Sequence, residues 1–82
     1  MNFFDRVQQL HALLRDRRSP ISGQQLQDEV ECSRATLHRL IAKLRDELGA
    51  PIIYVREPPG YRYRSDANFE LPGLWFTPHE LV

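Results

Sequence analysis

The sequence has 82 residues, 41% of them hydrophobic and 27% charged, so it is long enough for one small globular domain with a modest core. Its longest wholly apolar runs are only a few residues, which excludes a membrane-spanning segment, and its start, M-N-F-F-D-R, lacks the pattern of a secretory signal. A single cysteine, Cys32, excludes an internal disulfide, and together these features lead us to expect a cytoplasmic protein.

Acidic and basic residues balance to a formal net charge of zero, but they are unevenly distributed along the chain. Residues 1–64 contain all 11 Lys and Arg against 8 Asp and Glu, whereas residues 65–82 contain three acidic residues and no basic one. Many nucleic-acid-binding domains are strongly basic, so a net charge of zero argues against that function. Residues 1–64 are mildly basic, which weakens this argument only in part. We place a domain at residues 1–64, with a linker and the start of a following element at residues 65–82.

The first element is expected to be an amphipathic helix over residues 3–17. Its apolar positions recur at helical spacing, and Asp5 near the start complements the helix dipole. His11 lies on or next to the apolar side, where a packed, hydrogen-bonded histidine is more common than a ligand. Ser19-Pro20 then ends the helix. The apolar stripe consists of Phe3, Phe4, Val7, Leu10 and Leu14.

A second, short helix is expected from Gly23 to Val30, because Ser22 is a good N-cap. Very few residues separate it from the next helical pattern, so a tight turn must join the two helices. Cys32 lies in this turn, where a buried structural thiol is much more common than a reactive one. A short helix, a tight turn and a further helix together predict a helix-turn-helix.

The third helix is expected over residues 33–48, with Ser33 as its N-cap. No acidic residue occurs between Ser33 and Arg45, so the side opposite its apolar stripe carries small, polar and basic groups. Such a face suits a DNA major groove, but it is also typical of a core helix with a solvated outer side. The helix alone does not decide between these two interpretations. The stripe consists of Leu37, Leu40, Ile41, Leu44 and Leu48, and the basic residues are Arg34, Arg39, Lys43 and Arg45.

A β-hairpin is expected after the third helix, which Gly49 ends as a left-handed C′ residue. Residues 52–55 are β-branched and aromatic and predict one strand, residues 57–60 predict the turn, and residues 61–64 predict the second strand. Three helices followed by such a wing give a mainly α fold with a small β-hairpin, a winged helix-turn-helix.

The second predicted strand alternates aromatic and basic residues. Tyr61 and Tyr63 share one face, so if they pack on the helices, Arg62 and Arg64 point outward, where they could reach phosphate or the minor groove. The alternative is a plain capping hairpin with solvated arginines.

These residues resemble the N-terminal winged helix-turn-helix of the WYL-domain transcriptional regulators, which are related to the DeoR-type repressors. The most specific part of the resemblance is S-R-x-T-L-x-R combined with a G-Y-R wing. Glu57-Pro58-Pro59 departs from the glycines and basic residues often found in that wing, and the WYL effector domain is absent, so the chain resembles a module of a longer regulator. The other similar stretches are V-Q-Q-L-H-A-L-L-R-D-R-R, S-P-I-S-G-Q-Q-L, the rest of the third helix through G-A-P-I, and the link F-E-L-P-G-L-W-F-T-P-H-E-L.

The resemblance implies sequence-selective binding of double-stranded DNA by a bacterial-type transcriptional regulator, with helix 33–48 in the major groove and wing 52–64 on the backbone or minor groove. Arg39 is the strongest candidate for reading a base, because arginine bidentate to guanine is the commonest specific contact. Thr36 and His38 are the other base-edge candidates. Contacts to phosphate or the groove edge are expected from Gln24, Ser33, Arg34 and Lys43, and sequence-independent affinity from Arg62 and Arg64.

Two other functional classes stay open at this point. A winged helix used only for protein–protein interaction is slightly favoured by the zero net charge, and a DNA-binding module appended to an enzyme would resemble the biotin-ligase repressors. We expect no catalysis and no cofactor within these residues, because there is no Ser–His–acid set and no glycine-rich phosphate loop. No metal site is expected either, since His11, His38 and His79 are scattered and show no paired spacing around Cys32.

The tail is too apolar for a solvated linker, and it precedes a new helix start at Thr77. We expect its apolar residues to contact a missing effector domain or a second subunit, and a dimer of this kind would set two recognition helices on neighbouring half-sites. The alternative is that the tail folds back and closes the core of this domain. The apolar tail residues are Phe69, Leu71, Leu74, Trp75 and Phe76.

Overall fold

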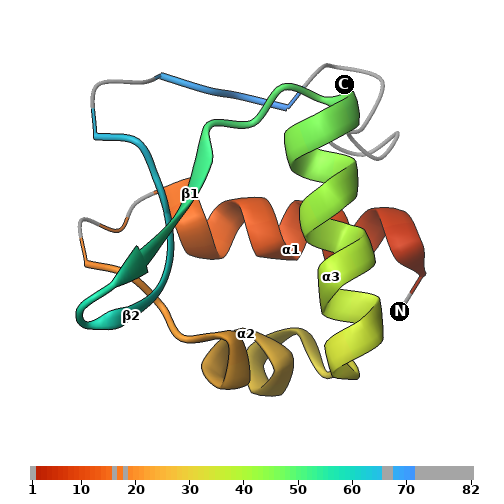
Figure 1. Cartoon of the computed structure of the whole chain (residues 1–82). Coiled ribbons are helices and arrows are strands. Elements are labelled where there is room, and N and C mark those ends of the chain that lie inside the picture. The colour runs from red at the N-terminus through yellow and green to blue at the C-terminus, as the bar shows by residue number, and fades with distance from the viewer. Residues whose placement is uncertain (1, 16, 18, 66–67, 72–82) are drawn as a thin grey trace.

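The computed structural model describes residues 2–15, 17, 19–65 and 68–71, in which three helices are followed by a two-stranded antiparallel hairpin (Figure 1). This arrangement confirms the predicted winged helix-turn-helix. The elements are α1 (Phe3–Arg15), α2 (Gly23–Val30), α3 (Arg34–Ala42), its continuation η1 (Lys43–Glu47), β1 (Ile52–Arg56) and β2 (Pro59–Tyr63).

The predicted N-caps account for where α2 and α3 begin. The Ser22 hydroxyl accepts a hydrogen bond from the Gln25 N–H at 3.0 Å, and the Ser33 hydroxyl accepts one from the Thr36 N–H at 3.1 Å. Each bond satisfies a backbone donor that has no partner within the first helical turn. α1 begins at the predicted residue and is described to Arg15, and Arg17, the predicted last residue, is not helical.

The third helix has nearly the predicted length, but its last turn is wider than an α-helix. η1 is a π-helical turn, and the Leu48 N–H donates to the carbonyl of Lys43, five residues earlier, at 3.2 Å. Gly49 has a φ of 75°, which confirms the predicted left-handed residue after the helix. The Ala50 N–H then donates to the carbonyl of Leu44 at 2.9 Å and closes the helix end.

The hairpin pairs Ile52 with Tyr63 at its base and Arg56 with Pro59 at its tip. Its turn is therefore shorter than predicted, because Pro59 and Gly60 belong to the second strand. Arg64 follows that strand, and its N–H donates to the carbonyl of Pro51 at 2.8 Å.

Gly60 is a site of close backbone approach. Next to it, Ile21 and Tyr61 exchange two backbone hydrogen bonds of 2.9 and 2.8 Å, so that the segment before α2 adds a one-residue bridge to the hairpin. A Cβ atom on Gly60 would lie 2.7 Å from the Ile21 carbonyl oxygen, closer than real Cβ contacts. The glycine that sequence reasoning assigned to the turn is therefore required by packing between two segments.

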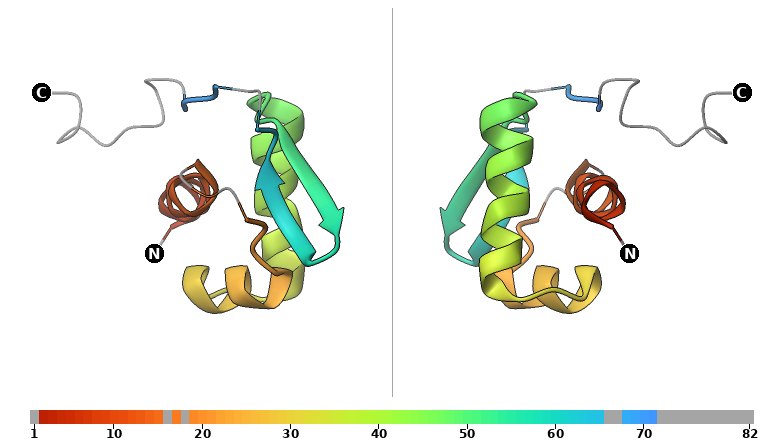
Figure 2. Two further views of the ribbon diagram at one scale, coloured as in Figure 1. Left: turned by 90° about the vertical axis from the view of Figure 1, so that its left-hand side faces the viewer. Right: turned by 90° about the vertical axis from the view of Figure 1, so that its right-hand side faces the viewer.

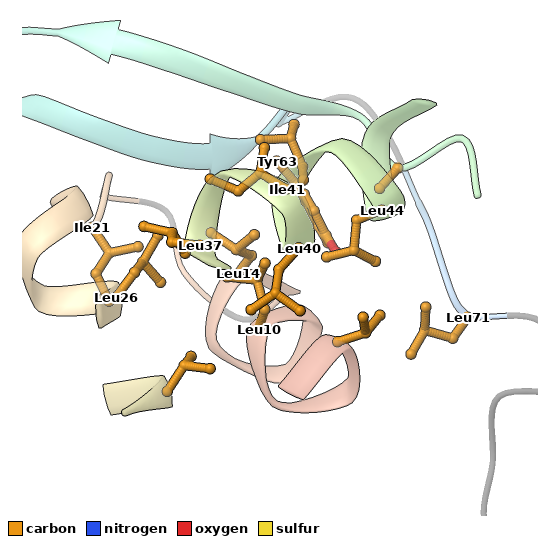
Figure 3. Packing of buried hydrophobic residues seen from close by; sticks show 14 residues of the cluster. Leu10, Leu14, Ile21, Leu26, Leu37, Leu40, Ile41, Leu44, Tyr63 and Leu71 are labelled. Carbon is orange, nitrogen blue, oxygen red and sulfur yellow. The ribbon is translucent and has the colours of Figure 1, made fainter. Parts of the chain in front are cut away.

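One hydrophobic cluster joins all these elements (Figure 3). α3 crosses in front of α1 in Figure 1, and both views of Figure 2 place α3 and the hairpin on the same side of α1. Arg34, Ala35, His38 and Arg39 of α3 are exposed in the described part of the chain. The leucines with no more than 1% exposure are Leu10, Leu14, Leu26, Leu37, Leu40 and Leu44.

His11 is buried at 5% exposure, and its Nδ1 lies 2.8 Å from the Tyr63 hydroxyl. The prediction of a packed, hydrogen-bonded histidine is thus confirmed. The contact joins the middle of α1 to the last residue of β2 and so anchors the base of the hairpin.

Residues 68–71 return to α1 after the hairpin. The Phe69 ring meets His11 and Tyr63 edge to face at centroid distances of 5.5 and 5.8 Å, and Glu70 forms a 2.9 Å ion pair with Arg15. Leu71 is 5% exposed and belongs to the core cluster. For Leu71 this corrects the expectation of a partner contact, because the domain's own core covers it. Phe69 is half-buried against the same core, and its partner contact stays a prediction. Leu74, Trp75, Phe76 and the predicted helix start at Thr77 lie outside the described residues.

Leu71→Ala should lower the free energy of unfolding of the chain by about 2–5 kcal/mol, because it removes a buried side chain and leaves a cavity. Asn68→Ala, at an exposed neighbouring position, should change it by less than about 0.5 kcal/mol. Urea unfolding of both variants measures the difference. If the two substitutions change the free energy of unfolding by equally small amounts, Leu71 does not close this core.

The Tyr63 hydroxyl should make the domain sensitive to alkaline pH. Burial raises its pKa above the ordinary value, and the Glu70 carboxylate raises it further. The stabilising contribution is therefore complete below about pH 10, where unfolded tyrosine is still protonated, and is lost as the pH rises towards the folded pKa.

Tyr63→Phe should lower the free energy of unfolding by about 1–2 kcal/mol at neutral pH, because it removes the hydrogen bond to His11. It should also reduce the fall in stability that accompanies a rise in pH through the alkaline range. Tyr54→Phe, at an exposed tyrosine, serves as the control and should keep the wild-type pH profile. Urea unfolding across the alkaline range tests this, and an unchanged slope in Tyr63→Phe would exclude Tyr63 as the titrating group.

Candidate nucleic-acid interface

The outer face of α3 is open along its first two turns. Arg34, Ala35, His38 and Arg39 are exposed there, and Thr36 is half-buried. The small Ala35 side chain leaves the helix backbone accessible between two arginines. Neither arginine forms an ion pair with an acidic side chain in the described part of the chain, so both charges are available to a ligand.

Three of the predicted contact residues on this face are linked to one another. The Ser33 hydroxyl donates to the Thr36 hydroxyl oxygen at 3.1 Å, and the Arg39 guanidinium donates to the same oxygen from Nη2 at 3.3 Å. The residues are spaced three apart, so the contacts follow one side of the helix. Ser33 is primarily the helix cap, and Thr36 joins that cap to Arg39.

The C-terminal part of the helix carries less available charge than the sequence indicated. Lys43 Nζ lies 2.8 Å from the Glu47 carboxylate, and Arg45 Nε lies 2.9 Å from the Asp46 carboxylate. The hydrogen bond from Arg45 lowers the pKa of Asp46, and the same bond raises the pKa of Arg45. Both pairs reach the solvent and are therefore weak, but they reduce the positive potential of this part of the helix.

α2 contributes mainly polar and acidic groups. The predicted contact Gln24 is exposed in its first turn and donates from Nε2 to the Asp28 carboxylate at 3.0 Å. Asp28 and Glu29 are also exposed, so a polyanion would meet repulsion over the second half of α2.

Side chains of α1 hold the turn between α2 and α3. Arg6 donates from Nη2 to the carbonyl of Glu31 at 3.2 Å, and Gln9 donates from Nε2 to the carbonyl of Glu29 at 2.7 Å. Glu31 adopts the left-handed conformation with a φ of 55°, which turns the chain sharply towards α3. Cys32 follows and packs half-buried against the core, as a structural thiol would. Sequence reasoning did not anticipate the roles of Arg6 and Gln9, because their acceptors are backbone atoms distant in sequence.

The two predicted wing arginines differ from the expectation. Tyr63 is buried and Tyr61 is half-buried, so the aromatic face packs inward as predicted. Arg62, however, is only half-exposed and donates from Nη1 to the carbonyl of Tyr63 at 3.0 Å. Arg64 is exposed but lies at the base of the hairpin, beyond the last strand pair.

Arg56 is the basic residue at the hairpin tip, and it was not among the predicted contacts. It is exposed and opposite Pro59, in the last pair before the turn. In Figure 2 this end of β1 projects on the side of α3 opposite α1. The exposed ring of Tyr54, two residues earlier on the same face, meets Tyr61 edge to face at 5.0 Å. Only the strand register could have identified Arg56, since a single arginine before Glu57 gives no periodic signal.

The structure thus brings two groups of cations to one side of the molecule. Arg34 and Arg39 lie on the open face of α3, and Arg56 lies at the hairpin tip, with α1 behind both (Figure 2). Among the described residues, no three His, Cys, Asp or Glu side chains gather as metal ligands would, and no described helix is long and apolar enough to cross a membrane.

A comparison with protein-family models matches residues 6–62, more than two thirds of the chain, to a family described as an HTH domain. The match extends from α1 to the second strand of the hairpin. Neither a curated protein nor a solved structure matches the chain.

Ser33→Ala should lower the free energy of unfolding by about 1 kcal/mol, because it removes the cap of α3. Ser19→Ala, at an exposed serine outside any helix, should have little effect. Thermal melts of the two variants provide the comparison, and equal melting temperatures would show that the Ser33 hydroxyl does not stabilise α3.

Proposed function

The chain belongs to the helix-turn-helix domain family that matches residues 6–62, and from this we propose that it binds double-stranded DNA sequence-selectively as the DNA-binding module of a bacterial-type transcriptional regulator. The observation that carries the proposal is the position of the available cations. Arg34 and Arg39 lie on an open, small-residue face of α3, and the hairpin tip with Arg56 lies on the same side of α1. A helix and a wing arranged in this way fit a major groove and an adjacent phosphate backbone or minor groove.

In this mode of binding the first half of α3 enters the major groove. Thr36, His38 and Arg39 are the side chains that read base edges, and Arg34 contacts a phosphate at the groove edge. Lys43 joins the phosphate contacts by exchanging Glu47 for a phosphate, a step that is easy because an exposed pair four residues apart contributes only about 0.3–0.5 kcal/mol.

The wing supplies affinity that does not depend on sequence. Arg56 is its main contact because it is exposed at the tip, whereas Arg62 donates to its own strand. Arg64, at the base of the hairpin, serves as a second and more distant phosphate contact. Ser33 and Gln24 contribute less to the groove edge, because each already uses a donor within the protein. Ser33 donates to Thr36, and Gln24 donates to Asp28.

We propose that the regulator is of the WYL-domain type, and the support for this is the resemblance of two motifs, S-R-x-T-L-x-R at the start of α3 and G-Y-R on β2. The remaining apolar tail residues, Leu74, Trp75 and Phe76, then dock on an effector domain or a second subunit. A dimer formed through such a contact would place two α3 helices on half-sites one or more helical turns apart.

A protein-interaction winged helix is the second candidate. It is favoured by the zero net charge and by the pairing of Lys43 and Arg45 with neighbouring carboxylates. Such a domain would bind random-sequence duplex weakly and with little dependence on salt.

DNA binding predicts a steep fall in affinity with salt. Each phosphate contact contributes a slope of about −0.9 to the logarithm of the association constant against the logarithm of salt concentration. Arg56→Ala should make the slope shallower by about 1 and weaken all duplexes alike, while Arg62→Ala should have a smaller effect.

Arg17→Ala is the matched control, because it removes one exposed positive charge that belongs to neither α3 nor the hairpin. Fluorescence anisotropy with a random-sequence duplex over a range of salt concentrations provides the measurement. If wild-type binding does not depend on salt, or if Arg17→Ala and Arg56→Ala weaken binding equally, the proposed mode of DNA binding is wrong.

A further inference from the structure

The contacts on the open face of α3 determine which hydrogens remain available to a ligand. A threonine hydroxyl has one hydrogen and two lone pairs. The Ser33 hydroxyl and the Arg39 guanidinium both donate to Thr36 Oγ1, at 3.1 and 3.3 Å, so both lone pairs have donors. The hydrogen of Thr36 is therefore left to donate.

Arg39 keeps most of its donors. Its guanidinium has five N–H groups and no acceptor, and the contact with Thr36 uses one of the two hydrogens on Nη2. The other N–H groups, including pairs that point the same way from adjacent nitrogens, stay available for a bidentate contact. Arg39 is exposed and forms no ion pair with a described acidic residue, so no carboxylate competes for these donors.

The tether also restricts the arginine side chain. A free arginine loses rotamer entropy when it is fixed in one conformation. The hydroxyl of Thr36 is itself held by Ser33, the cap of α3, so it is a fixed point to which the guanidinium can be attached. Part of the ordering needed for binding is then already present in the unbound protein.

We propose that Thr36 is a positioning residue for Arg39, and that the two side chains together present only donors and thereby select a guanine in the major groove. This inference rests on the proposed DNA binding. Guanine offers two acceptors, N7 and O6, in the major groove, whereas adenine pairs an acceptor with a donor. The N6 amino group of adenine is a donor, so it would face the donors of Thr36 and Arg39 and leave donor hydrogens without an acceptor.

The test starts with selection of preferred duplexes from a random-sequence pool by the wild-type chain. Each guanine of the selected site is then replaced by 7-deazaguanine, which lacks the N7 acceptor. For the wild type, one such replacement should weaken binding about tenfold, the range expected for part of a bidentate base contact.

Thr36→Val removes the hydroxyl but keeps the branched shape and the backbone N–H that donates to Ser33. It should reduce the penalty for 7-deazaguanine at that position to about twofold or threefold, because the guanidinium is no longer held. Thr36→Ser keeps the hydroxyl and should retain the tenfold penalty. Arg39→Lys keeps the charge without the bidentate geometry and should behave as Thr36→Val does.

The possible outcomes separate this inference from the proposed function. An unchanged penalty in Thr36→Val, or an equal reduction in Thr36→Val and Thr36→Ser, overturns the positioning role while DNA binding stands. A wild-type chain that binds duplex with a steep salt dependence but tolerates every 7-deazaguanine overturns the selection of guanine. A wild-type chain that binds no duplex refutes the proposed function and the inference with it. Circular-dichroism melts of each variant confirm that α3 is folded.

Discussion

The backbone contact between Ile21 and the hairpin determines where the wing lies. A two-stranded hairpin is only marginally stable by itself, and this one gains a bridge through the hydrogen bonds of 2.9 and 2.8 Å between Ile21 and Tyr61. Ile21 is 1% exposed and immediately precedes the cap of α2, so the same residue belongs to the core, the hairpin and the start of the helix-turn-helix. Gly60 permits this approach because any side chain there would collide with the Ile21 carbonyl.

Two further contacts extend this constraint to the surface of α3. His11 and Tyr63 join α1 to the base of the wing, and Arg6 and Gln9 join α1 to the turn before α3. α1 therefore lies behind both parts of the candidate interface and fixes one relative to the other (Figures 1 and 2). A rigid relation between helix and wing lets one domain engage a groove and the neighbouring backbone together.

Local sequence signals predicted most of the fold. Ser22, Ser33 and Gly49 act as the caps that their residue types indicated, since capping depends on the nearest few residues. The role of Gly60 could not be predicted, because a glycine required by a distant carbonyl is indistinguishable in sequence from one required by a turn. The burial of Leu71 could not be predicted either, since an apolar tail indicates that some surface covers it but not whether that surface belongs to this domain or to a partner.

The candidate site was predicted less completely than the fold. The sequence located the exposed arginines of α3, but it did not reveal the pair between Lys43 and Glu47 or the strand register that places Arg56 at the tip. Such features depend on rotamers and on long-range pairing, which composition and periodicity do not determine.

We propose that one face, formed by the first half of α3 and the tip of the wing, binds duplex DNA. Amide chemical-shift perturbation by NMR during titration with a selected duplex is the most direct test, since it reports every residue that has a backbone N–H, without mutation. The largest changes are expected over residues 33–43 and at Arg56 and Glu57, with little change on the outer side of α1. Changes concentrated on α1, or no changes at a saturating duplex concentration, would contradict it.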